Sequence, residues 1–152
     1  MHAPADLRLA EAIERARAHS PFLRQQLETL PEVAAALRSG SLEAALAAAA
    51  QDRDGDLAAA LRRERSGVAL ALAIGDLAGL LPLERVVETL SDLADRALDR
   101  AVAAAIAERT PGAEPRGFAI IALGKHGSRE LNFSSDIDLL FLYDPAALPL
   151  KP

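Results

Sequence analysis

Apolar residues in the first 110 positions recur every three or four residues, which is the period of an amphipathic helix. Leu9, Ile13 and Ala16 follow this spacing in the first segment. Capping residues, or proline at the first helical position, mark helix starts, and such signals stand at Ser20-Pro21, Pro31, Ser41, Asp56 and Pro82. The pattern predicts a helical bundle whose longest member runs from Pro82 to about Glu108. Within the helix that starts at Asp56, Gly67 is a predicted weak point because glycine disfavours helix.

The pattern changes after the segment 110–115, which is rich in proline and glycine and is a linker by composition. Two short, continuous apolar runs follow, Gly117–Leu123 and Ile137–Tyr143, and each predicts a buried strand. The loop Gly124–Ser135 lies between them, with a helical turn expected around Ser128 to Leu131. The predicted fold is mainly α with a C-terminal α/β start: a helical region over 1–110 and an incomplete α/β domain over 116–152.

The predicted sheet is too small to be stable alone. The residues after the second strand are too few to add another one, and a two-stranded sheet is marginal in water. We therefore expect the sequence to be truncated, or its sheet to be completed by a partner.

Composition narrows the classes of protein that the chain can be. The formal net charge is −5, so the basic surface of a nucleic-acid binder is missing. There is no cysteine, which excludes disulfides, thiolate zinc sites and a cysteine nucleophile. The apolar runs are too short to span a bilayer, and the first residues do not form a signal peptide. We expect a cytoplasmic protein with no nucleic-acid or membrane partner.

The candidate chemistry lies in and around the second apolar run. Asp136 and Asp138 are one residue apart, and on a strand this spacing puts both carboxylates on the same face. Neighbouring carboxylates repel each other unless a cation lies between them, and their hard oxygen ligands suit Mg²⁺. Upstream, Gly127 and Ser128 offer backbone N–H groups and a hydroxyl to a phosphate. A glycine loop, a serine and Asp-x-Asp on a strand outline a nucleotidyl-transfer site.

These residues belong to a longer motif that resembles a known family. The motif reads Gly-Lys-x-Gly-x-x-Glu-Leu-Asn-x-x-Ser-Asp-x-Asp-Leu-x-Phe-x-Tyr, and the chain meets it at Gly124, Lys125, Gly127, Glu130, Leu131, Asn132, Ser135, Asp136, Asp138, Leu139, Phe141 and Tyr143. The helical segments 61–65, 74–77 and 89–95 are similar to the lead-in of the same family. The chain thus resembles the bacterial glutamine synthetase adenylyltransferase/deadenylylase (glutamate–ammonia-ligase adenylyltransferase).

The resemblance implies a fold and an activity. The family belongs to the DNA polymerase β-like nucleotidyltransferases, so the α/β start is expected to be the beginning of such a domain. Its N-terminal domain removes AMP from a tyrosine of glutamine synthetase by phosphorolysis, which releases ADP. Its C-terminal domain attaches AMP from ATP, and PII proteins control the balance in nitrogen assimilation. Asn132 with Ser134-Ser135 looks like the deadenylylase version of the motif, which places the chain at the N-terminal domain.

The resemblance also assigns roles to individual residues. It makes Asp136 and Asp138 the catalytic ligands of Mg²⁺, which would neutralise the phosphate in an in-line displacement. The phosphate-binding loop then comprises Gly127, Ser128, Lys125, Arg129 and Ser135. Within that loop, Ser135 and Asn132 are expected to fix the backbone and not to touch the substrate.

The chain also departs from the family pattern. His126 stands where the family usually has an apolar residue, and Ser128 where it often has glycine. The third carboxylate expected on a later strand has no candidate, because Asp144 lies in the turn after the same strand. The metal site is therefore incomplete, and we expect the isolated chain to be catalytically inactive or nearly so.

Two other interpretations remain open at this point. The first is the related PII uridylyltransferase, whose motif also ends in Ser-Asp-x-Asp-Leu-Leu. That family favours Gly-Gly-Tyr-Gly-Arg-Gly-Glu-Leu, which the segment 125–130 does not match. The second is a non-catalytic helical module that binds glutamine synthetase or PII and keeps only a vestigial pair of strands.

Overall fold

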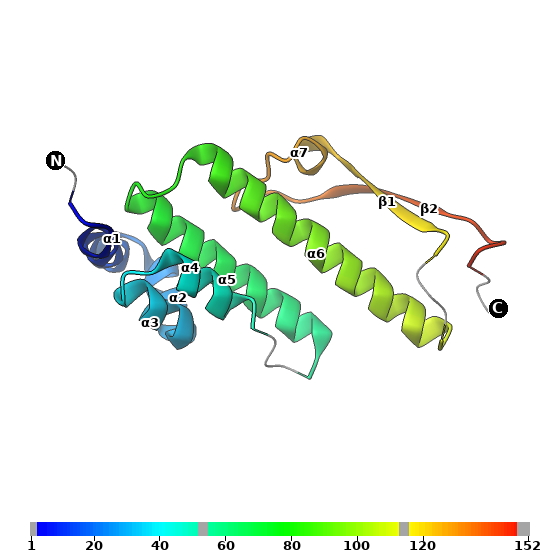
Figure 1. Ribbon diagram of the computed structural model, residues 1–152, viewed down its shortest axis with the longest axis horizontal. Coiled ribbons are helices and arrows are strands. Elements are labelled where there is room, and N and C mark those ends of the chain that lie inside the picture. Colours follow the sequence, from blue (N-terminus) through cyan, green and yellow to red (C-terminus); the bar gives the residue numbers. More distant parts are fainter. Residues whose placement is uncertain (1–2, 52–54, 113–115, 149–152) are drawn as a thin grey trace. The chain divides into compact units, whose positions relative to one another are not determined.

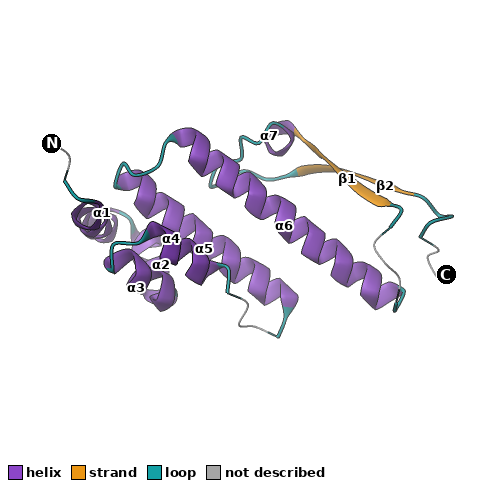
Figure 2. Cartoon of the chain, viewed as in Figure 1, coloured by secondary structure: helices purple, strands orange, loops and turns teal. Residues whose placement is uncertain are grey.

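A computed structural model describes residues 3–51, 55–112 and 116–148. These residues form seven helices and one two-stranded antiparallel sheet (Figure 2), so the mainly helical fold class is confirmed. The chain divides into two units, residues 1–86 and 87–152. The polymerase β-like domain, and a functional boundary between residues 110 and 116, stay predictions. Residues 113–115 of the expected linker lie outside the described part.

The regular elements in the described residues of the first unit are all helices (Figure 1). Its helices are α1 (Ala5–His19), α2 (Pro21–Thr29), α3 (Pro31–Arg38), α4 (Leu42–Ala49) and α5 (Leu57–Leu77), followed by the start of α6 (Leu83–Arg109). The starts agree with the predicted signals. The side chains of Ser20, Ser41 and Asp56 each accept hydrogen bonds from backbone N–H groups in the first turn of the following helix, which satisfies donors that a helix leaves unpaired.

The core of this unit is built from aliphatic side chains, and it includes Leu9, Ile13 and Ala16, the stripe expected in the first segment. The fully buried large residues are Leu9, Val33, Leu37, Leu70, Leu72 and Ile74. The C-terminal end of α5 is closed by α1, because the guanidinium groups of Arg8 and Arg15 donate to the carbonyls of Ala78, Gly79 and Leu77. A positive charge at this end also complements the helix dipole.

The structure explains why a glycine stands at position 67, which the sequence alone did not reveal. A β-carbon there would lie 2.7 Å from Cβ and 3.1 Å from Cα of Ala49 on α4. Two helices that approach this closely need a residue without a side chain. Gly67 is therefore a packing position of α5 against α4 and not only a weak point in the helix.

The second unit pairs most of α6 with a β-hairpin and a short helix. Strand β1 (Phe118–Leu123) runs antiparallel to β2 (Asp138–Tyr143), with Phe118 opposite Tyr143 and Leu123 opposite Asp138. Helix α7 (Gly124–Gly127) follows β1 directly, so the predicted helical turn starts four residues earlier than expected. No helix in the described residues is long and apolar enough to cross a membrane.

Both strands exist as predicted, but they are not buried. Every second residue of β1 is exposed, and Ile121, Leu123, Leu140 and Leu142 expose between 43% and 49% of their surface. By the register these four side chains share one face of the hairpin. Residues of α6 line a cavity with the other face. Within the described part of this unit, a two-stranded sheet with one helix leaves that apolar face uncovered.

We predict that Gly67→Ala destabilises the chain by about 1–3 kcal/mol, because the added methyl group overpacks the contact with Ala49. Helix propensity alone would give the opposite sign, since alanine is the better helix former. Urea denaturation followed by circular dichroism measures the change. Gly55→Ala is the matched control, since nothing lies within 4 Å of a β-carbon at that position; equal midpoints for both variants would refute the packing argument.

Candidate functional site

The structure brings the glycine turn and one candidate carboxylate together. Leu123 is opposite Asp138 in the hairpin, and the chain turns into α7 at Gly124, whose φ is +55°. A β-carbon at Gly124 would lie 3.1 Å from Oδ2 of Asp138. Glycine thus provides both the left-handed backbone and the room beside this carboxylate.

Asp136 lies outside the strand, which corrects the prediction that both aspartates sit on it. Strand β2 begins at Asp138, and β1 ends opposite it, so residues 136 and 137 have no partner strand. The turn that precedes Asp136 is closed by Asn132 and Ser135. The Asn132 N–H donates to Ser135 Oγ at 3.1 Å, and the Ser135 N–H donates to the Asn132 carbonyl. These two residues hold the loop backbone, as expected.

Asp136 and Asp138 are both exposed and offer the hard oxygen atoms that suit Mg²⁺. They fit as part of a metal site, with Gly124 leaving space beside Asp138. In the described residues, no group of three or more acidic or histidine side chains gathers where it could hold a metal ion. Asp144 stands at the opposite end of β2 from Asp138, where its Oδ1 accepts the Ala146 N–H at 2.9 Å, so it serves the turn.

The phosphate-loop candidates lie on α7 and directly after it. The backbone of Gly127 packs on β1 so closely that a β-carbon would lie 2.5 Å from the carbonyl oxygen of Ala122. The Ser128 hydroxyl is 3.1 Å from Glu130 Oε2 and 3.3 Å from the carbonyl oxygens of Gly124 and Lys125. In this conformation the serine closes the turn. Lys125 is exposed on the same turn.

His126 is the buried member of this turn, and sequence reasoning treated it only as a departure from the pattern. Its side chain is 2% exposed and its Nε2 lies 2.8 Å from Asp95 Oδ1 on α6. An ionised carboxylate can only accept, so Nε2 donates. The other ring nitrogen, Nδ1, is buried and has no hydrogen-bond partner among the described residues. An unpartnered buried nitrogen costs about 1–3 kcal/mol.

Two more residues of α6 hold the same loop. The Arg129 guanidinium binds Asp92 and lies 3.5 Å from Asp95 Oδ2, and the hydrogen bond to Asp92 raises the pKa of Arg129. The buried Ser91 hydroxyl donates to the Val87 carbonyl at 2.8 Å and accepts the Leu131 N–H at 3.4 Å. Ser91, Asp92 and Asp95, which we call the polar edge of α6, therefore bind three residues of the loop 126–131.

Sequence reasoning missed the polar edge because a helical pattern shows which residues are polar but not which of them contact a loop 31 to 40 positions later. Ser91 offered the available signal. It directly follows the apolar residue Leu90, and a serine in a helix can bond the carbonyl four residues back.

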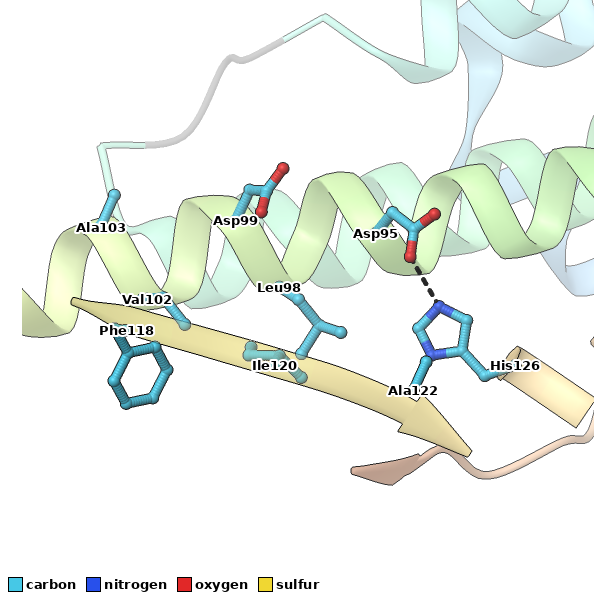
Figure 3. A pocket seen from close by; sticks show the side chains of 9 residues that line it. All are labelled: Asp95, Leu98, Asp99, Val102, Ala103, Phe118, Ile120, Ala122 and His126. Carbon is cyan, nitrogen blue, oxygen red and sulfur yellow. Dashed lines mark hydrogen bonds and ion pairs between the residues drawn. The ribbon is translucent and has the colours of Figure 1, made fainter. Parts of the chain in front are cut away.

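A cavity of about 660 Å³ lies between α6 and β1, lined by Asp95, Leu98, Asp99, Val102, Ala103, Phe118, Ile120, Ala122 and His126 (Figure 3). The register puts the side chains of Leu123 and Asp138 on the opposite face of the hairpin from Phe118 and Ile120. The cavity is therefore not the candidate metal site, and the loop residues reach it only through His126.

Comparison with known proteins identifies the family. The family model for glutamate-ammonia ligase adenylyltransferase matches residues 7–149. The chain belongs to this family. It is 44% identical over 115 residues, 68% of its length, to the bifunctional glutamine synthetase adenylyltransferase/adenylyl-removing enzyme of Xanthobacter autotrophicus. It is also similar to the enzymes of the same name from Chromobacterium violaceum (40% over 148 residues, 87% of the chain) and Burkholderia mallei (38% over 144 residues, 87% of the chain).

The chain spans only 12%, 17% and 16% of the length of these three relatives, in the same order. No solved structure matches it. The resemblance to the adenylyltransferase family is confirmed. The names of the relatives include both the adenylylating and the adenylyl-removing activity, so they do not tell which of the two activities this segment corresponds to.

We predict that Gly127→Ala loosens the loop, because its methyl group cannot fit against the Ala122 carbonyl. The N–H groups of Ser128, Arg129 and Glu130, which bond carbonyls within the turn, should exchange at least about tenfold faster, as local opening predicts. Hydrogen exchange followed by NMR reads these amides. Lys125→Ala, an exposed change on the same turn, is the control and should leave them unchanged. Unchanged exchange in Gly127→Ala would contradict the close packing.

Proposed function

We propose that this chain is the segment of a glutamine synthetase adenylyltransferase/adenylyl-removing enzyme that carries the phosphate loop and the first two metal-binding carboxylates of the adenylyl-removing site. The observation that carries the proposal is the placement of Asp138 Oδ2 beside Gly124, at the start of the glycine turn. A nucleotidyl-transfer site needs its phosphate cradle and its metal-binding carboxylate side by side.

The residues then take the following roles. Asp136 and Asp138 bind Mg²⁺, which when bound neutralises phosphate charge. Gly127 and Ser128 approach the phosphate, and the Lys125 ammonium adds positive charge from the same turn. Asn132 and Ser135 fix the loop that leads to the carboxylates.

The assignment to the adenylyl-removing copy rests on the motif. Asn132, Ser134 and Ser135 are the residues typical of that copy, and here they form one turn, since the Ser134 N–H also donates to Asn132 Oδ1 at 3.0 Å. The proposed reaction is attack of inorganic phosphate on the AMP–tyrosine of glutamine synthetase. This attack forms ADP and restores the tyrosine hydroxyl. ATP as the substrate of the opposite reaction, PII as a regulator and a cytoplasmic location are further parts of the proposal.

The test is calorimetric titration of the chain with ADP, with and without Mg²⁺. We expect ADP binding that requires Mg²⁺ and that weakens at least about tenfold in Asp136→Asn and in Asp138→Asn. Replacing a residue that only hydrogen-bonds to a metal ligand already lowers metal affinity by about tenfold or more, so replacing a ligand should cost at least as much. Asp144→Asn removes the same charge at the other end of β2 and should bind normally. Equal affinity with and without Mg²⁺ would contradict the proposed metal site.

A second prediction concerns turnover. Because the described residues contain no third acidic or histidine ligand beside the two aspartates, we expect the isolated chain to release no measurable ADP from adenylylated glutamine synthetase and phosphate. Robust Mg²⁺-dependent release of ADP would refute the claim that the metal site of the isolated chain is incomplete.

The competing proposal is a non-catalytic module that binds glutamine synthetase or PII. It is favoured by helices α1 to α5 of the first unit, which carry none of the candidate site residues. Tight, metal-independent binding of the chain to glutamine synthetase, together with no affinity for ADP, would support the module against the enzyme segment.

A further inference from the structure

Arg129 occupies an unusual position for an arginine. Among the described residues it is the one non-glycine residue with a positive φ, at +61°, a backbone conformation that is uncommon for long side chains. The backbone conformation at Arg129 is therefore energetically unfavourable, and the contacts of the side chain have to offset it. The side chain reaches back to α6, where it binds Asp92 and approaches Asp95.

The charges around Arg129 argue against a direct contact with phosphate. Its guanidinium faces two carboxylates one helical turn apart, at positions i and i+3 of α6. An anion brought up to the same guanidinium would meet the repulsion of both carboxylates at close range. Lys125 is exposed on the preceding turn and has no carboxylate partner among the described residues, so it is better placed to meet a phosphate.

The contacts on either side of Arg129 also indicate that this part of the loop is held against α6. His126 Nε2 donates to Asp95 at 2.8 Å, and the Leu131 N–H donates to Ser91. The loop is thus attached to the polar edge of α6 before, at and after Arg129. Gly127 and Ser128, the residues proposed to approach phosphate, lie between the first two attachments.

We propose that Arg129 is a positioning residue and not a phosphate ligand, and that Asp92 and Asp95 of α6 act with it to hold the phosphate loop. This inference rests on the proposed function, since it assigns how the same loop is kept in place. It changes the role that the family resemblance suggested for Arg129.

A charge exchange separates the two roles. Arg129→Asp and Asp92→Arg each break the ion pair and place like charges together, and the double variant restores the pair with its ends exchanged. Aspartate tolerates the positive φ at position 129 better than arginine does. The readouts are the affinity for ADP with Mg²⁺, measured below the melting transition, and the exchange of the amides of residues 128–131. Glu108→Arg adds the same positive charge at an exposed position near the other end of α6 and is the control.

We expect each single variant to bind ADP about tenfold more weakly, and the double variant to return to within about threefold of the unsubstituted chain, a coupling typical of residues in contact. Glu108→Arg should not weaken binding. A double variant as weak as Arg129→Asp alone would overturn the inference, because the guanidinium itself would then be required.

A failure of the proposed function can be told apart from a failure of the positioning role. If the unsubstituted chain does not bind ADP with Mg²⁺, the proposed function fails for this chain. The positioning role is then decided by amide exchange. Faster exchange at residues 128–131 in both single variants, reversed in the double variant, supports the role; unchanged exchange overturns it.

Discussion

The attachment of the loop 126–131 to the polar edge of α6 is the interaction on which the candidate site depends. A hairpin of two six-residue strands cannot by itself fix a fourteen-residue connection between them, from Gly124 to Ile137. Side chains from about one and a half turns of α6 supply the contacts that hold this connection in place. Ser91 binds a backbone N–H, Asp95 binds a buried imidazole, and Asp92 binds a guanidinium. Each contact restrains the loop at a different residue.

Two glycines set the geometry that these contacts maintain. Gly127 allows the loop to lie directly on the Ala122 carbonyl, and Gly124 turns the chain beside the Asp138 carboxylate. A side chain at either position would push the loop away from the strands or crowd the carboxylate. The glycines of the motif therefore follow from close packing of the backbone within this unit, in addition to any role in admitting a phosphate.

The helices and their starts could be predicted from the sequence, because the signals are local. Ser20, Ser41 and Asp56 cap the helices that follow them, and prolines open α2 and α3, as the sequence signals indicated. Both strands could be located for the same reason. Their burial could not, because it depends on what covers each face. The position of Asp136 outside β2 was also beyond local reasoning, since it follows from where β1 ends.

The contacts that hold the loop could not be predicted, because they join residues about 31 to 40 positions apart. Helical periodicity cannot tell a solvated carboxylate from one that binds an imidazole or a guanidinium, so it gave no role to Asp92 or Asp95 of α6. His126 was visible only as a departure from the family motif. Its burial in the second unit, with Nδ1 unpartnered among the described residues, gives that departure a structural meaning: the position contacts α6.

The most direct test of a phosphate and metal site built from residues 124–138 is an NMR titration of the isotope-labelled chain, first with Mg²⁺ and then with ADP. We predict that Mg²⁺ shifts the amide signals around Asp136 and Asp138, and that ADP then shifts those of Lys125 to Ser128. Shifts confined to the helices of the first unit, or no shifts at saturating Mg²⁺ and ADP, would contradict it.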